Sequence, residues 1–179
     1  MSTLTKILYA AKNWESHLRG LVLGTTRTAN GMTFQGTLAA KLTRANGLVD
    51  DLGVLSRRVV TDAGVAFMAT DFFDGSTEIT SFDWHASGTG TATESVSDTA
   101  MGTDSGVARV SGTATNPAPG QYRTVATMTY VSPLAITEHG VFSASTSGTL
   151  WDRSVFAAIN VVSGDSISFT YTLTCSSGG

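Results

Sequence analysis

The sequence predicts a mainly β protein: an antiparallel β-sandwich or jelly roll with one short helix and an extended N-terminal arm. Composition is the first observation, since only 14% of the 179 residues are charged, whereas 28 are Thr, 20 Ser and 19 Gly. Such a composition is typical of strands and turns rather than of helical bundles. Several segments also alternate apolar and polar residues with period two, and short turns such as residues 116–120 and 145–148 separate them.

Charge divides the chain into two regions. Residues 1–58 hold eight Lys and Arg against three Asp and Glu, a net +5, whereas residues 59–179 hold three against eleven, a net −8. We therefore predict a basic N-terminal arm over residues 1–53 and a β-sandwich body over residues 54–179. Such an arm is expected to meet an acidic surface. Its basic residues are dispersed and not interleaved with aromatics, which does not favour nucleic acid as the partner.

Within the arm, residues 4–19 have the apolar spacing of an amphipathic helix. The apolar positions are Leu4, Ile7, Leu8, Ala11, Trp14, Leu18 and Leu21. Asn30-Gly31 and Asn46-Gly47 each favour a tight turn, and the first is placed in a hairpin. A short helix and a lone hairpin are marginal by themselves, so we expect the arm to pack on its own body or on a partner.

The body is expected to begin with a strand over residues 55–60 and then a helix over residues 63–73, capped by Asp62 and ended by Gly75. The predicted buried stripe of this helix is Val65, Phe67, Met68 and Phe72.

About seven strands should follow residue 54. The clearest covers residues 166–175, where five apolar residues alternate with Ser and Thr. A second, over residues 121–131, places Tyr122, Ala126, Met128 and Tyr130 on one face. Residues 155–162 are apolar on both faces and predict a covered central strand. Residues 87–104, rich in Gly, Thr, Ser and Ala, are expected to form a long loop with little core.

Several classes of protein are not favoured by the sequence. No run of 18 apolar residues predicts a transmembrane helix, and the N-terminal stretch does not resemble a signal peptide. The single cysteine, Cys175, cannot close an intrachain disulfide, which fits synthesis in a reducing cytoplasm. Gly88-Thr89-Gly90 has no lysine after it, so it does not predict a phosphate-binding loop.

The residues that could carry chemistry are few. Asp83 and His85, with His139 or Glu138 as a third ligand, have a spacing compatible with a metal site. Hydrogen bonding at a surface or interface is the plainer interpretation of these histidines. Glu138 and Arg153 are expected to form a salt bridge across neighbouring strands. We assign no catalytic residue, no metal and no cofactor, and we do not predict an enzyme. Trp151 lies beside a turn and is interpreted as an interface anchor.

Five segments together resemble a block that recurs in small structural proteins of tailed bacteriophages. In that family a "Tyr/Trp-His-x-x-Gly-Thr-Gly" string precedes an "Asp-Thr-Ala-Leu" string. The matching segments here are Trp84–Thr91, Asp98–Met101, Ile136–Ser143, Leu150–Asn160 and Gly164–Tyr171. The resemblance covers roughly residues 54–175 and implies a virion component, without distinguishing head from tail.

The first hypothesis is therefore a capsid decoration, or cement, protein. It would be made in the host cytoplasm, bind the outside of the assembled head as a homotrimer, and contact the major capsid protein through the arm, with neither nucleic acid nor membrane as a partner. The expected coat contacts are Trp14, Leu18, Arg19, Arg27 and Arg44. The expected oligomer or partner interface contains Trp151, Arg153 and His139.

Two alternatives remain open. One is a tail or baseplate component that binds glycans through Trp84 or Trp151. The other is a small cupin-like metalloenzyme that uses Asp83, His85 and His139, although the His-x-His typical of cupins is absent.

Overall fold

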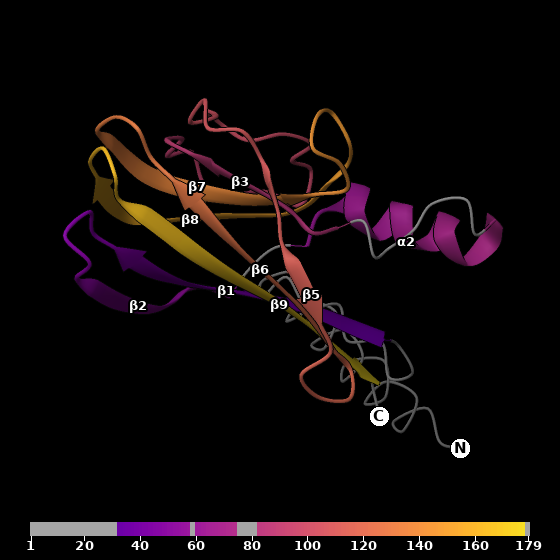
Figure 1. The fold of residues 1–179 in the computed structure, drawn as a ribbon. Helices are drawn as coiled ribbons and strands as arrows, with labels where there is room; N and C mark the ends of the chain where they lie inside the picture. The colour runs from indigo at the N-terminus through magenta and orange to yellow at the C-terminus, as the bar shows by residue number, and fades with distance from the viewer. Residues whose placement is uncertain (1–31, 58–59, 75–81, 178–179) are drawn as a thin grey trace, which may run out of the picture. The chain divides into compact units, whose positions relative to one another are not determined.

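The computed structural model describes residues 32–57, 60–74 and 82–177. The chain divides into a large compact unit, Gln35–Leu173, and a small unit that comprises Met1–Phe34 and Thr174–Gly179. Of the small unit only residues 32–34 and 174–177 are described, as the ends of two strands. The core and the candidate sites lie in the large unit (Figure 1).

Two antiparallel sheets form the fold (Figure 1). The five-stranded sheet has the order β2-β1-β9-β6-β5, and the four-stranded sheet has the order β4-β3-β7-β8. In chain order the strands are β1 (Met32–Thr43), β2 (Val49–Ser56), β3 (Trp84–Gly88), β4 (Val110–Ser111), β5 (Thr113–Thr115), β6 (Gln121–Thr129), β7 (Leu134–Phe142), β8 (Leu150–Val161) and β9 (Ser166–Ser177). The predicted mainly β fold is confirmed and fits a β-sandwich. The jelly-roll variant, which has eight strands, is not established by this strand order.

The main core lies between the two sheets and follows from period-two patterning. In β9 the apolar residues at 167, 169, 171 and 173 are buried, while the Ser and Thr between them are half-buried on the other face. In β6 and just after it, Ala126, Met128 and Tyr130 are buried in the same way, as predicted. These residues meet β1 and β7, whose Leu38, Leu42 and Ile136 belong to the same cluster.

Residues 35–53 correct the predicted boundary of the arm. β1 and β2 are hydrogen-bonded neighbours in the five-stranded sheet, and Leu38, Ala40 and Leu42 are each at most 2% exposed. Burying three apolar side chains against the other sheet stabilises these strands, so they belong to the body although their charge resembles that of the arm. The predicted helix over residues 4–19 and the hairpin at Asn30-Gly31 fall in residues 1–31, outside the described residues.

β8 is an edge strand, so the prediction of a covered central strand is wrong. It pairs with β7, and its middle carries exposed Ala157 and Ala158. A register irregularity, in which Ile136 faces Ile159 but Glu138 faces Val155, places a bulge at this part of β8. Bulges of this kind blunt an edge against pairing with another sheet. Ala157 and Ala158 are therefore exposed although the sequence of this segment is apolar.

The helix α2 (Asp62–Asp74) appears where the sequence predicted it. Its N-cap is Thr61 rather than Asp62, because the Gly64 N–H donates to Thr61 Oγ1 at 3.0 Å. Met68 is buried as predicted, but Val65 is 42% exposed. Gly64 faces the Trp151 ring instead, where a Cβ would lie 2.8 Å from it. Among the described residues, no helix is long and apolar enough to cross a membrane.

The long loop was predicted over residues 87–104; residues 87 and 88 belong to β3, and the loop of residues 89–104 covers the outer face of the four-stranded sheet (Figure 1). A small second core lies there. It consists of Ala86, Phe142 and Leu150, with Trp84 and Met101 packed against them. The loop therefore does pack on the body, contrary to the expectation that it has little core. Both faces of β7 are therefore covered, and its polar residues are buried on either face.

Candidate functional site

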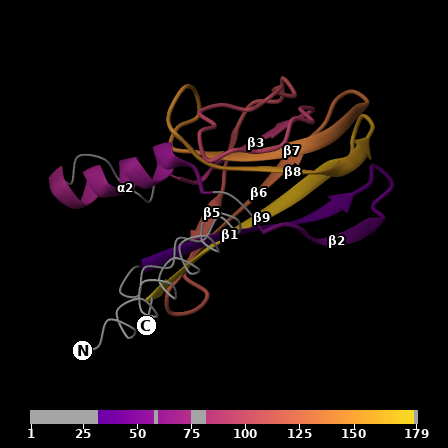
Figure 2. The same cartoon turned by 180° about the vertical axis from the view of Figure 1, so that it is seen from behind.

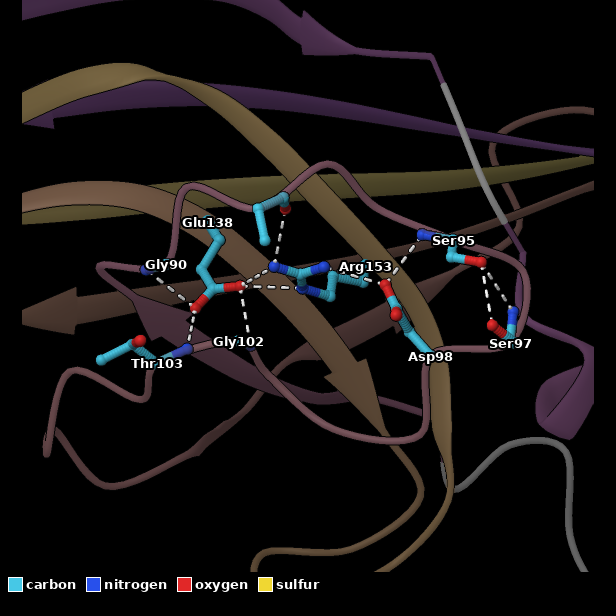
Figure 3. A network of polar contacts seen from close by, with 9 residues as sticks. Gly90, Ser95, Ser97, Asp98, Gly102, Thr103, Glu138 and Arg153 are labelled. Atoms are coloured by element: carbon cyan, nitrogen blue, oxygen red, sulfur yellow. Dashed lines mark hydrogen bonds and ion pairs between the residues drawn. The ribbon is translucent and has the colours of Figure 1, made fainter.

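Glu138 and Arg153 form the predicted salt bridge across β7 and β8. Glu138 Oε2 lies 2.8 Å from both Nε and Nη2 of Arg153 (Figure 3). Both side chains are buried, at 0% and 3% exposure, on the sheet face that the loop of residues 89–104 covers. Both guanidinium nitrogens converge on the same carboxylate oxygen, and hydrogen bonds between charged groups are stronger than neutral ones.

Backbone N–H groups of the loop donate further hydrogen bonds to the Glu138 carboxylate. Oε1 accepts from Gly90 at 3.0 Å and from Thr103 at 2.6 Å, and Oε2 accepts from Gly102 at 3.0 Å (Figure 3). Burial by itself would raise the pKa of Glu138, but the hydrogen bonds from Thr103, Gly102 and Arg153 outweigh it and lower the pKa. Glu138 is therefore an ionised carboxylate held by internal donors.

Arg153 extends the network to two further residues of the loop. Nη1 donates to Asp98 Oδ2 at 2.8 Å and Nη2 to the Ala92 carbonyl at 3.1 Å. Two loop glycines allow this close approach: a Cβ on Gly90 would collide with Glu138 Oε1, and one on Gly102 would lie 2.6 Å from Arg153 Nη2. The ion pair fastens the loop to the sheet. We call these residues the outer network: Glu138, Arg153, Asp98, Gly90, Gly102 and Thr103.

The interior between the sheets holds a second polar cluster, centred on two histidines. His85 Nδ1 of β3 and His139 Nε2 of β7 lie 2.9 Å apart, and both side chains are 0% exposed. His85 Nε2 contacts Thr124 Oγ1 of β6, on the opposite sheet, at 3.1 Å. The His139 ring packs on Phe169 of β9, with ring centroids 4.5 Å apart. We call His85, His139 and Thr124 the inner histidine cluster.

Burial keeps both histidines uncharged. It lowers the pKa of His85 to about 4, and burial together with the neighbouring His85 lowers that of His139 well below its ordinary value. On the same face of the sheet, burial shifts the pKa of Asp152 in the opposite direction. Burial raises the pKa of Asp152 to about 8, although Ser154 and Tyr171 hydrogen-bond to it. Near neutral pH the interior therefore holds neutral forms of all three groups.

The metal-site alternative is not supported by this arrangement. Neighbouring residues of a strand point to opposite faces, so Glu138 faces the loop while His139 faces the interior. Asp83 Oδ2 accepts from Ser111 Oγ at 2.9 Å at the partly exposed start of β3. Within the described ranges, no three His, Cys, Asp or Glu side chains are grouped to hold a metal ion.

The three residues assigned to an oligomer or partner interface are all buried within the chain. Trp151, Arg153 and His139 are 1%, 3% and 0% exposed, so the interface assignment is corrected. Trp151 packs against Phe82 and donates from Nε1 to Tyr171 Oη at 2.9 Å. Its position beside a turn resembled a surface site because the sequence does not reveal that α2 covers it.

Among the expected coat contacts, Arg44 is engaged internally. Its Nη1 lies 3.0 Å from Asp165 Oδ2 and donates to the Asn160 carbonyl at 2.9 Å, while Nε lies 3.7 Å from Asp50 Oδ2. Arg44 thus joins the β1–β2 turn to the β8–β9 turn, and its side chain is still 37% exposed, so its assignment as a coat contact stays a prediction. Trp14, Leu18, Arg19 and Arg27 lie outside the described residues.

Four exposed apolar residues, not anticipated from the sequence, lie on or beside three turns at one end of the sandwich. Three turns meet there, as Figures 1 and 2 show from opposite sides: the Gly164 N–H donates to the Tyr130 carbonyl, and the Ala45 N–H to Asp165 Oδ1. These turns expose Leu48 (59%), Val49 (55%), Val131 (83%) and Val162 (52%). We call these four residues the apolar end. Single exposed valines carry no signal in a sequence, and only the folding of distant turns brings them together.

An open depression between β2 and β8 is lined by Val54, Leu55, Ser56, Arg57 and Val155. None of the residues assigned from the sequence lines it, and it does not include the outer network or the inner histidine cluster. Comparison with known proteins adds no constraint: no family model matches the sequence, and no curated protein matches it.

Proposed function

We propose that this protein is a capsid decoration protein of a tailed bacteriophage, which binds the outside of the assembled head and stabilises it. Its partners in this proposal are the major capsid protein and further copies of itself in a homotrimer. A protein that binds only the assembled shell stabilises that shell by mass action. Many copies on one shell also strengthen weak individual contacts through multivalency.

The observation that carries the proposal is the apolar end. Four of the seven large apolar side chains that are exposed in the described part of the chain lie there, on or beside turns joined by the Asp165 carboxylate and by backbone hydrogen bonds of Tyr130. The nearby charged side chains are paired within the chain, since Arg44 contacts Asp50 and Asp165, and Lys41 contacts Asp51. A preordered apolar surface without free charges favours contact with another protein surface.

The segments that resemble phage structural proteins support a structural role. Trp84–Thr91, Asp98–Met101 and Ile136–Ser143 supply three of the six residues of the outer network, namely Gly90, Asp98 and Glu138. Their polar atoms contact one another rather than facing an open site. A recurring set of residues that fastens a loop to a sheet is what a shared scaffold requires, whatever each protein binds.

The charge asymmetry also supports attachment to a partner, with a shorter segment than the sequence first indicated. Residues 1–31 carry Lys6, Lys12, Arg19 and Arg27 against Glu15, which is 4 minus 1, or +3. This segment retains the apolar positions from Leu4 to Leu21. We propose that this segment contacts the coat, with Trp14, Leu18, Arg19 and Arg27 as the candidate contacts.

Binding to shells that lack the protein tests this proposal directly. Wild-type protein should restore occupancy and raise the temperature at which the shells rupture. The double variant Val131→Asp/Val162→Asp should bind at least about tenfold more weakly, because it places two charges in the contact. The matched control, Val65→Asp/Val96→Asp, changes exposed valines away from the apolar end and should bind like wild type.

Three other results would each contradict the proposal. They are an absence of shell binding by the wild type, equal loss in both double variants, and a copy number per virion set by tail rather than head symmetry. Binding to a glycan array or to host cells without shell binding would favour the tail or baseplate alternative. That alternative can no longer use Trp151 as a sugar platform, since the ring is buried.

A further inference from the structure

The hydrogen bonds of the inner histidine cluster leave no place for an added proton. One N–H joins the two rings, and His85 Nε2 faces the Thr124 hydroxyl. The fourth ring nitrogen, His139 Nδ1, is buried and has no hydrogen-bond partner. The neutral tautomer in which His139 Nε2 donates to His85 leaves only a lone pair at Nδ1. Protonating His139 instead creates a buried N–H without an acceptor, next to a buried charge.

The surroundings offer no counter-charge. On the opposite sheet, Tyr122 and Thr124 belong to β6, Tyr130 directly follows it, and Phe169 and Tyr171 belong to β9. The phenols are neutral, since burial raises the pKa of Tyr122 and of Tyr130 to about 12.

From the same sheet, β3 contributes Ser87, and β8 contributes Ser154, which lies opposite His139 in the register. The carboxyl on this face, Asp152, accepts a hydrogen bond from Ser154 Oγ and stays protonated near neutral pH, and Glu94 of the loop contributes to raising its pKa. Arg153 and Glu138 neutralise each other on the other face of the sheet.

We propose that His85 and His139 form an acid-sensitive switch: the neutral pair holds the two sheets together near neutral pH, and protonation of the pair separates them. Protonation acts on the contact of the pair with Thr124 and Phe169, which joins the four-stranded sheet to the five-stranded one. A doubly charged pair 2.9 Å apart, enclosed between Phe169 and the rest of the core, is incompatible with that contact.

The direction of the pH effect follows from proton counting. In the unfolded chain each histidine takes up a proton near pH 6.5, whereas in the folded chain the two stay neutral to much lower pH. Below pH 6.5 each one therefore raises the unfolding equilibrium constant about tenfold per pH unit. Asp152 opposes one of them, because it is protonated when folded and ionised when unfolded above about pH 4. The net expectation is about a hundredfold rise in the unfolding constant between pH 6.5 and 4.5.

Nuclear magnetic resonance of the imidazole groups tests the switch in the intact wild-type chain, which has only three histidines. From pH 7.5 to 4.5, two of them should keep the chemical shifts of neutral rings with fixed tautomers for as long as the protein is folded. The third histidine is His17, and a His17→Gln variant identifies its signals. Titration of His85 or His139 near pH 6.5 in the folded protein would overturn the proposal.

Urea unfolding at several pH values supplies an independent measurement. Wild type and the His17→Gln control should both show the hundredfold rise between pH 6.5 and 4.5. In His139→Phe, which keeps a ring against Phe169, one titrating group is lost, so the remaining histidine and Asp152 should cancel and leave the unfolding constant nearly flat. A wild-type slope in His139→Phe would overturn the proposal. If His139→Phe does not fold, the nuclear magnetic resonance titration of the wild-type protein still tests the proposal.

Discussion

Two consecutive residues of β7 show how one sheet can bury ionisable groups in two different ways. Glu138, on the outer face, is ionised and meets five donors from Arg153 and from loop amides. His139, on the inner face, is neutral and leaves Nδ1 without a partner. Both side chains are 0% exposed, so burial does not distinguish them. The difference lies in their partners. Glu138 keeps its charge because Arg153 and backbone N–H groups surround it, whereas His139 has no such partners and stays neutral.

The largest effect should come from breaking the outer network. Glu138→Ala leaves the Arg153 guanidinium buried with only Asp98 as a charged partner, and we expect a loss of about 3–5 kcal/mol in the free energy of unfolding, measured with urea. Amide hydrogen exchange should accelerate throughout residues 89–104.

A double variant sharpens this test. Glu138→Met/Arg153→Leu removes both charges together and should be less destabilised than Glu138→Ala, because no buried charge remains unpaired. If the double variant loses as much as the sum of the two single variants, the unpaired charge is not what makes Glu138→Ala unstable.

Asp152 should produce a medium effect with the opposite pH dependence to the histidines. A raised pKa means that the folded state holds the proton more tightly, so the contribution of Asp152 to stability is complete below pH 3.8 and is lost as pH rises to about 8. Between pH 6.5 and 8, wild type should lose about 2 kcal/mol in the free energy of unfolding.

Asp152→Asn keeps the shape of the side chain and removes the titration. Its stability should be nearly constant between pH 6.5 and 8 when urea unfolding is repeated at each pH. An unchanged alkaline slope in Asp152→Asn would assign that slope to another group.

The smallest effect belongs to the exposed ion pair Lys41–Asp51. Its nitrogen and oxygen lie 3.3 Å apart, and both side chains are more than 60% exposed. Solvent and salt screen such a pair, so Lys41→Met should change the free energy of unfolding by less than about 1 kcal/mol. A larger loss of stability would mean that solvent exposure does not explain why this ion pair contributes less than the buried pair of the outer network.

Much of the sandwich could be predicted from the sequence because its strands alternate strictly. The alternation of β9 and of β6, the helix α2 and the Glu138–Arg153 pair all follow from local pattern and spacing. The predicted arm boundary was wrong because it followed the distribution of charge. The alternating apolar residues Leu38, Ala40 and Leu42, which are buried in the body, indicate a strand instead.

The site residues were harder to place because their environment depends on long-range packing. Trp151, His139 and Arg153 are polar or amphipathic residues, which usually lie near a surface. Here α2, the opposite sheet and the loop of residues 89–104 bury them. Thr124, the contact of His85 on the opposite sheet, carries no signal of its own, since it is one of 28 threonines.

The contrast between the two faces is tested most directly by the carboxyl ¹³C chemical shifts of Glu138 and Asp152 in the folded protein at pH 6.5. We predict the shift of an ionised carboxylate for Glu138 and that of a protonated carboxyl for Asp152, with Asp152 losing its proton only near pH 8. Two carboxyls in the same state at pH 6.5 would contradict the account.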